Sequence, residues 1–165
     1  MIIVCDLDGT IANNEHRLQY LETRPKDWES FYNAEHMKND VPFPQAQLVF
    51  RKIMAVPSIH MVFLTGRPVR TQGVTAWWLY ANYGWNVVYE DQASAFLGSP
   101  ARPGLALMLM RSDTDRRTAD VYKEQKVQAL GSLRPDEAFL FIDDDERCYE
   151  MYSRYGVILR TPECW

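Results

Sequence analysis

The sequence has no apolar run long enough to cross a membrane, little cysteine and no excess of basic residues. Its longest nearly apolar stretch, residues 104–110, is far short of the roughly 20 residues that a membrane span needs. The cysteines Cys5, Cys148 and Cys164 show no CxxC spacing, and the first residues lack the basic and long apolar segments of a signal peptide. These absences predict a reduced, cytoplasmic protein without membrane contact.

Charge, histidine spacing and chain length bear on nucleic-acid binding, zinc binding and the number of domains. A formal net charge of -4 argues against nucleic-acid binding by bulk electrostatics alone, although it leaves a local basic groove open. His16, His36 and His60 are scattered without the spacing of zinc ligands, so a zinc site is not expected. A chain of 165 residues that is 47% hydrophobic fits one domain of ordinary size, and we see no repeats or second domain boundary. We therefore expect a single domain over residues 1–165.

The first ten residues carry the strongest pattern. Residues 2–4 are apolar and β-branched without alternation, which is typical of a strand buried on both faces of a parallel sheet. Asp6 and Asp8 follow it, at the edge where α/β folds bind their ligands. Two carboxylates held so close repel each other unless a cation lies between them. The pattern therefore predicts a metal site.

Hydrophobic spacing along the rest of the chain predicts alternating strands and helices. Further strands are expected over 59–64, 86–89, 105–110, 138–142 and 157–159, and helices over 45–56, 71–83, 118–130 and 146–155. Residues 90–103 and 111–118 are expected to be loops. The alternation predicts a doubly wound, Rossmann-like α/β fold, with a parallel sheet covered by helices on both faces.

Residues 13–44 interrupt this alternation with polar, aromatic and charged sequence. A short helix within 26–33, capped by Asp27, would place Trp28, Phe31 and Tyr32 on one side. A plain long connection is one interpretation, but about 30 residues with their own helix are more typical of a lid or binding loop. We expect a small cap insertion above the end of the first strand; whether it moves as a lid stays open.

Aromatic residues and one cysteine near these segments have two interpretations each. Trp28 with Tyr32 is the best candidate to stack on a nucleobase. Trp77 and Trp78 are adjacent on one helix and cannot share a face, so at least one of them is expected in the core. Cys5 precedes Asp6 but alternates into a buried strand without a companion base, which favours a structural thiol.

Three predicted strands end in polar groups that should meet at one edge of the sheet. These groups are Asp6-Leu-Asp8, Thr65-Gly-Arg67 and Asp143-Asp-Asp145, and Lys123 could reach the same edge from the side. Phosphoryl transfer through an aspartyl-phosphate needs such groups. A carboxylate attacks phosphorus, Mg²⁺ offsets the repulsion between them, and a lysine stabilises the spreading charge.

The segments Asp6-Leu-Asp-Gly-Thr10, Thr65, Lys123 and Asp143-Asp144 resemble, in order and context, the four motifs of the haloacid dehalogenase (HAD) superfamily of phosphatases. The resemblance implies that Asp6 is the nucleophile and a Mg²⁺ ligand. Asp8 would be the general acid and then the base, with its backbone carbonyl on the metal. Thr65 would hydrogen-bond a phosphoryl oxygen, and Lys123 would neutralise the phosphate and Asp6. Asp144 is our first choice for the remaining metal ligand and Asp143 the second, whereas Asp145 is expected to cap the following helix.

A closer resemblance is to the 3'-phosphatase domain of phage polynucleotide kinase-phosphatases. It rests on residues 111–123, where an Asp-x-Arg, a later Asp and the lysine recur at the spacing of that domain, and on Phe141-Ile-Asp-Asp144 followed by a helix that Gly156 closes. The chain departs from these proteins because it has no GxxxxGK[ST] phosphate loop, so no kinase activity is implied, and residues 13–44 match no motif of theirs.

The resemblance implies a Mg²⁺-dependent phosphomonoesterase, and the expected substrate is a 3'-phosphate end of DNA or RNA. One alternative is a nucleotidase, a phosphatase of free nucleotides, in which the insertion would close over a whole small molecule. Another is a non-catalytic binder of phosphorylated ends, which is disfavoured because every chemical group for catalysis is present. The oligomeric state stays open.

The residues beside these motifs are candidates for substrate binding, because guanidinium groups bind phosphates through two hydrogen bonds. The candidates are Gly66, Arg67, Arg111 and Arg117. Asp113, Asp115 and Asp120 lie among the arginines of the 111–118 segment, so a solvated ion pair explains Arg116 and Arg117 equally well. Arg111, at a strand end, is favoured as functional.

Overall fold

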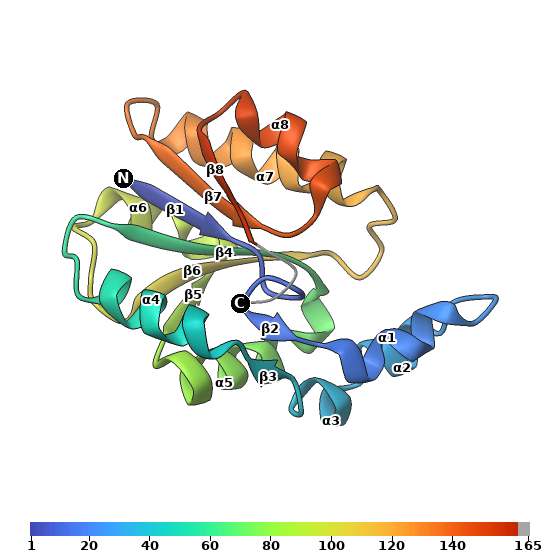
Figure 1. Cartoon of the computed structure of the whole chain (residues 1–165). Coiled ribbons are helices and arrows are strands. Elements are labelled where there is room, and N and C mark those ends of the chain that lie inside the picture. The colour runs from blue at the N-terminus through green and yellow to red at the C-terminus, as the bar shows by residue number, and fades with distance from the viewer. Residues whose placement is uncertain (162–165) are drawn as a thin grey trace.

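A computed structural model describes residues 1–161, so Cys164 lies outside the described residues. Six strands form one sheet in the order β5-β6-β4-β1-β7-β8, and every neighbouring pair is parallel (Figure 1). The strands are β1 (Ile2–Cys5), β4 (His60–Pro68), β5 (Asn86–Tyr89), β6 (Leu105–Arg111), β7 (Phe139–Asp143) and β8 (Val157–Arg160). All the predicted strands are therefore present.

Helices cover both faces of this sheet (Figure 1). One face packs against α4 (Pro44–Met54) and α5 (Gln72–Tyr83), and the other against α6 (Ala93–Gly98), α7 (Ala119–Leu133) and α8 (Tyr149–Ser153). Within β1, Ile3 packs in the core under α4 and α5, while Ile2 and Val4 pack in the core under α6, α7 and α8. The unbroken apolar run is therefore buried on both faces of the sheet. The doubly wound α/β fold is confirmed.

Several predicted element boundaries are wrong. Residues 90–103 are not a plain loop, because they contain the 3-10 turn η2 (Glu90–Gln92) and α6, whose Phe96 and Leu97 are buried against the sheet. The helix α7 continues past Gly131 to Leu133, since one glycine inside a helix costs only about 1 kcal/mol. Residues 146–155 are divided between the 3-10 turn η3 (Glu146–Cys148) and α8.

The insertion (residues 13–44) holds more structure than the one predicted helix. It contains α1 (Glu15–Glu22), α2 (Trp28–Phe31) and α3 (Ala34–Met37), and the short antiparallel strands β2 (Ala12–Asn13) and β3 (Val41–Pro42) close its base. Asp27 caps α2 as predicted, because its carboxylate accepts a hydrogen bond from the N–H of Ser30 at 2.9 Å. Figure 1 shows the insertion beyond the end of the sheet toward which β1 points.

Two further predictions can be checked in this fold. Trp78 is fully buried in the core, whereas its neighbour Trp77 is 51% exposed, so the two do lie on different faces of the helix. Within residues 1–161, none of the helices is long and apolar enough to cross a membrane.

Candidate active site

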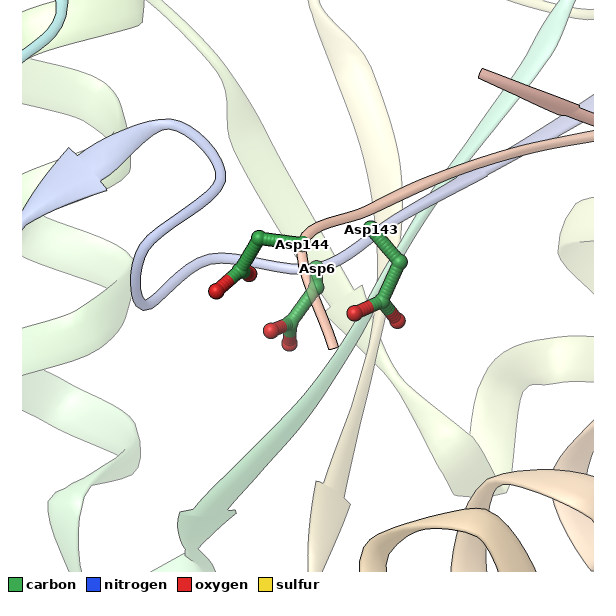
Figure 2. Close-up of side chains that lie close together, drawn as sticks. All are labelled: Asp6, Asp143 and Asp144. Carbon is green, nitrogen blue, oxygen red and sulfur yellow. The ribbon is translucent and has the colours of Figure 1, made fainter. Parts of the chain in front are cut away.

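Three carboxylates meet where β1 and β7 end (Figure 2). Asp6 follows β1, Asp143 is the last residue of β7, and Asp144 comes next. The two strands pair in parallel, with Cys5 opposite Ile142, so the residues that follow emerge side by side. Each carboxylate offers one oxygen, and these oxygens all lie within 4.8 Å of one another. The cluster could therefore hold a metal ion.

The state of Asp6 fits a cation at this position. Asp6 is buried, with 8% of its surface exposed, and its Oδ1 has no hydrogen-bond partner among the described residues. Burial raises the pKa of Asp6, the charge of Lys123 lowers it, and the neighbouring carboxylates raise it again, so that the net shift is upward. Carboxylate oxygens suit hard divalent cations, and such an ion would relieve both the repulsion and the missing hydrogen bond.

Lys123 places a positive charge inside this cluster. Its Nζ lies 2.7 Å from Oδ2 of Asp143 and 3.4 Å from Oδ1 of Asp6, and its side chain is buried. Burial lowers the pKa of Lys123, but Asp6 and Asp143 raise it by more, so the ammonium stays charged. The lysine reaches the sheet edge from α7, as predicted.

Asp143 is held from three sides. Its Oδ2 accepts hydrogen bonds from Lys123 and, at 2.8 Å, from the hydroxyl of Tyr152, and its Oδ1 accepts from the N–H of Asp145 at 3.0 Å. The sequence did not indicate Tyr152, because an aromatic residue at helical spacing is typical of plain core packing. Asp145 does cap the following turn, since its carboxylate accepts from the N–H of Arg147.

The glycine and threonine after Asp8 position Asp144. The Thr10 hydroxyl donates to Oδ1 of Asp144 at 2.6 Å and accepts from the N–H of Asp144 at 3.1 Å. Gly9 has a φ of +81°, and a Cβ there would lie 2.3 Å from Oδ2 of Asp144. Only glycine lets the turn take this shape and the carboxylate come so close.

Asp8 faces a second group of charges rather than the acidic cluster. Its carboxylate pairs with Arg17 of the insertion and with Arg67, whose Nε and Nη2 donate at 3.0 and 2.7 Å. Asp40, fully buried, pairs with the same two guanidinium groups, each at 2.7 Å. Burial raises the pKa of Asp8, but the charges and hydrogen bonds of Arg67 and Arg17 outweigh it, so the net pKa is lowered.

Arg17 and Asp40 were missed by the sequence analysis. They stand in polar sequence of the insertion, where no spacing or motif distinguishes them from surface residues. Both side chains have no exposed surface. Buried charges are rare unless they are paired, and that pairing is formed only by the tertiary structure.

Thr65 and Gly66 lie on β4, the strand next to β1. Thr65 is buried, and its hydroxyl accepts from the N–H of Arg67 at 3.2 Å. The register of β4 shifts between Thr65 and Pro68, which turns the backbone at this point. The carbonyl of Gly66 accepts from the Tyr32 hydroxyl of the insertion at 3.4 Å.

The two arginines of the 111–118 segment differ in their surroundings. Arg111 lies against Tyr122, 4.7 Å from the ring centre, and its Nη2 would be 3.9 Å from a Cβ on Gly66, which places it beside the motif of β4. Its buried Nε finds no acceptor in the described part of the chain. Arg117 instead pairs with Asp115, which agrees with the interpretation of this residue as part of a solvated ion pair.

Together, these groups place a carboxylate and an ammonium at a sheet edge, beside a second carboxylate bound by two arginines. No protein-family model and no curated protein matches this chain.

Two solved structures of the Pnkp1/Rnl/Hen1 RNA repair complex contain similar chains. One is 19% identical with a TM-score of 0.63 over 97% of this chain, and the other is 20% identical with a TM-score of 0.65 over 96%. The matches span 42% and 44% of those longer chains. At these identities the likeness concerns the fold, and the chain thus shares the α/β fold of a protein from an RNA repair complex.

Proposed function

We propose that this protein is a Mg²⁺-dependent phosphomonoesterase of the HAD type that removes the phosphate from 3' ends of a polynucleotide. The observation that carries the proposal is the buried Asp6, whose Oδ1 accepts no hydrogen bond among the described residues and lies 3.4 Å from Nζ of Lys123, within a cluster of three carboxylates. Lys123 compensates part of the negative charge of this cluster, and a divalent cation bound by the carboxylates would supply the rest of the compensation that an attack on a phosphate requires.

In this proposal, Asp6, Asp143 and Asp144 would hold Mg²⁺, and the family resemblance adds the backbone carbonyl of Asp8 as a further ligand. The ion, when bound, offsets the negative charge of the phosphate. A carboxylate oxygen of Asp6 attacks phosphorus and forms an acyl phosphate, while the bond from phosphorus to the ester oxygen breaks. For Asp8 to act as the general acid, its carboxyl must be released from Arg17 and Arg67, which lower its pKa in this structure, and take up a proton, which it then donates to the leaving oxygen.

The second half of the reaction frees the enzyme. Asp8, now ionised, takes a proton from a water molecule, and the resulting hydroxide attacks the phosphorus of the acyl phosphate. Inorganic phosphate leaves and the carboxylate of Asp6 is restored. Throughout, Lys123 neutralises charge on Asp6 and the phosphate, and Thr65 hydrogen-bonds a phosphoryl oxygen.

The proposal of a polynucleotide substrate rests on two resemblances. The 111–123 segment resembles the corresponding loop of phage 3'-phosphatase domains, and the fold resembles that of a protein from an RNA repair complex. Arg111 is the arginine proposed to contact a substrate phosphate, with Gly66 beside it. Arg67 and Arg117 are weaker candidates, because Arg67 is buried and pairs with Asp8 and Asp40, and Arg117 pairs with Asp115.

The experiment that tests the proposal compares 3'-phosphorylated DNA and RNA oligonucleotides with 3'- and 5'-mononucleotides, with Mg²⁺ and with a chelator. We expect phosphate release from the oligonucleotides, dependent on Mg²⁺. Preference for 5'-mononucleotides would establish the nucleotidase alternative, and tight binding without turnover would establish the non-catalytic binder.

A second assay tests the nucleophile. Asp6→Asn should abolish turnover of an aryl phosphate, whereas Asp136→Asn, at an exposed aspartate, should leave it unchanged. If aryl phosphate turnover survives Asp6→Asn, the nucleophile is a different residue.

A further inference from the structure

The insertion presents a tryptophan that is exposed yet held in a fixed orientation. Trp28 is 47% exposed. Its ring stacks on that of Tyr32, with 5.9 Å between the centres and 14° between the planes, and it meets the edge of Phe31 at 6.0 Å. Phe31 is itself buried. A large apolar ring is therefore kept at the surface by the two aromatic side chains beneath it.

The same stack is connected to the residues of the candidate active site. Tyr32 donates its hydroxyl to the carbonyl of Gly66, the residue after Thr65. Burial raises the pKa of Tyr32 to about 12, so this hydroxyl keeps its proton and remains a donor. Arg17, the partner of Asp8, lies over the Phe31 ring at 4.5 Å and donates to the Phe31 carbonyl at 3.1 Å. The exposed Trp28 ring is thus connected through Tyr32 to Gly66 and through Phe31 and Arg17 to Asp8.

A positive charge accompanies the ring. The ammonium of Lys26 lies 5.5 Å from the centre of the Trp28 ring, and within residues 1–161 this lysine forms no ion pair. Proteins that bind single strands combine aromatic side chains, on which bases stack, with cations that follow the backbone phosphates. Lys26 and Trp28 offer both within one short segment.

We propose that Trp28 is a stacking platform for a nucleobase at the phosphorylated 3' end of a single strand, and that Lys26 pairs with a neighbouring phosphodiester. The inference rests on the proposed function and specifies its substrate as a polynucleotide, because a mononucleotide has a base but no phosphodiester. Trp77 offers a comparison: it is equally exposed, at 51%, but stacks on no aromatic ring in the described residues.

The first test measures how much the base contributes to catalysis. The quantity is the ratio of kcat/KM for a base-bearing 3'-phosphorylated oligonucleotide to that for one with an abasic 3' end. Trp28→Ala should lower this ratio by about 5- to 150-fold, the usual effect of losing one base-stacking contact. Trp28→Phe should retain much of it, and Trp77→Ala should keep the full ratio. An unchanged ratio in Trp28→Ala would overturn the platform.

The second test concerns Lys26. In Lys26→Gln, the salt dependence of oligonucleotide binding should weaken by about 0.7 in the slope of log affinity against log salt, the value for one phosphate contact in a single strand. Binding of a 3'-mononucleotide should keep its slope. If the mononucleotide and the oligonucleotide respond alike, the phosphodiester contact is refuted.

A binding measurement separates this inference from the proposed chemistry. A 3'-phosphorylated oligonucleotide should quench the tryptophan fluorescence of Asp6→Asn, and this quenching should be lost when Trp28→Phe is added. That result would support the platform even if the wild type hydrolysed no phosphate and the proposed function failed. Quenching that persists in the double variant would refute the platform, whatever the protein hydrolyses.

Discussion

Replacing Lys123 by methionine removes the positive charge inside the acidic cluster at nearly constant volume. Asp143 would keep only its hydrogen bonds from neutral donors, and Asp6 would have no opposite charge beside it. Breaking a buried ion pair by removing one partner costs about 3–5 kcal/mol. At about 2–4 °C per kcal/mol for a chain of this size, the Tm should fall by about 6–20 °C in a metal-free buffer.

The matched control is Lys126→Met, three residues along the same helix. Lys126 pairs with the exposed Glu90 at 2.7 Å, and surface pairs of this kind contribute about 0–1 kcal/mol. Its Tm should therefore fall by less than about 4 °C. Differential scanning calorimetry with a chelator measures both variants.

Adding Mg²⁺ then tests whether the cluster binds a cation. A ligand at 100 times its Kd stabilises the folded state by about 2.7 kcal/mol, which corresponds to about 5–11 °C here. The gain should be larger in Lys123→Met than in the wild type, since an ion would replace the lost ammonium, and it should vanish when Asp144→Asn is added. Equal losses of Tm in Lys123→Met and Lys126→Met would refute a stabilising role of the buried lysine. A Tm that does not change with Mg²⁺ in the wild type and in Lys123→Met would refute cation binding by the cluster.

Three other outcomes are expected. Gly9→Ala should lower activity by roughly 100-fold, because the new methyl group would lie 2.3 Å from a carboxylate of the cluster and displace it, whereas Gly73→Ala, at an open helix position, should match the wild type in a steady-state assay. Burial raises the pKa of the Cys5 thiol, and that of Cys148 to about 12, so both should resist iodoacetamide at pH 8 until the protein is unfolded, as peptide mapping would reveal. The lowered pKa of Asp8 stabilises the folded state at pH values above about 4, the pKa of this group in the unfolded chain. The difference in unfolding free energy between the wild type and Asp8→Asn, measured by urea titration, should therefore become smaller below about pH 4. A difference that stays constant with pH would contradict this.

The sheet and its reactive edge could be predicted because their signals are local. The unbroken apolar run of β1 indicated burial on both faces, and the parallel arrangement then required Asp6 and Asp143 to emerge at one edge. The geometry agrees with both expectations. The predicted end of a helix at residue 83 also matched, since Gly84, which follows α5, adopts the left-handed conformation typical of a helix end.

Other features depend on contacts that no local pattern records. The short helix α6 was missed because the neighbouring prolines and small residues favoured a loop, although Ala93, Phe96 and Leu97 have helical spacing. The direction of the Asp8 side chain was also beyond the sequence. Arg17 and Arg67 bind this carboxylate, and Asp40 pairs with both guanidinium groups. These pairs exist only once the chain has folded.

That pairing bears on whether the insertion can move as a lid. Among residues 1–161, two buried ion pairs cross its boundary, Arg17 with Asp8 and Asp40 with Arg67. The indole N–H of Trp78 also donates to the Asp40 carbonyl at 2.8 Å. A rigid opening would separate both pairs, and breaking even one buried pair costs about 3–5 kcal/mol unless water or a ligand replaces the lost partner. A phosphate bound by the arginines is such a ligand. Any opening of the insertion is therefore coupled to the charges around Asp8, and a substrate that competes for Arg17 or Arg67 would loosen the insertion as it binds.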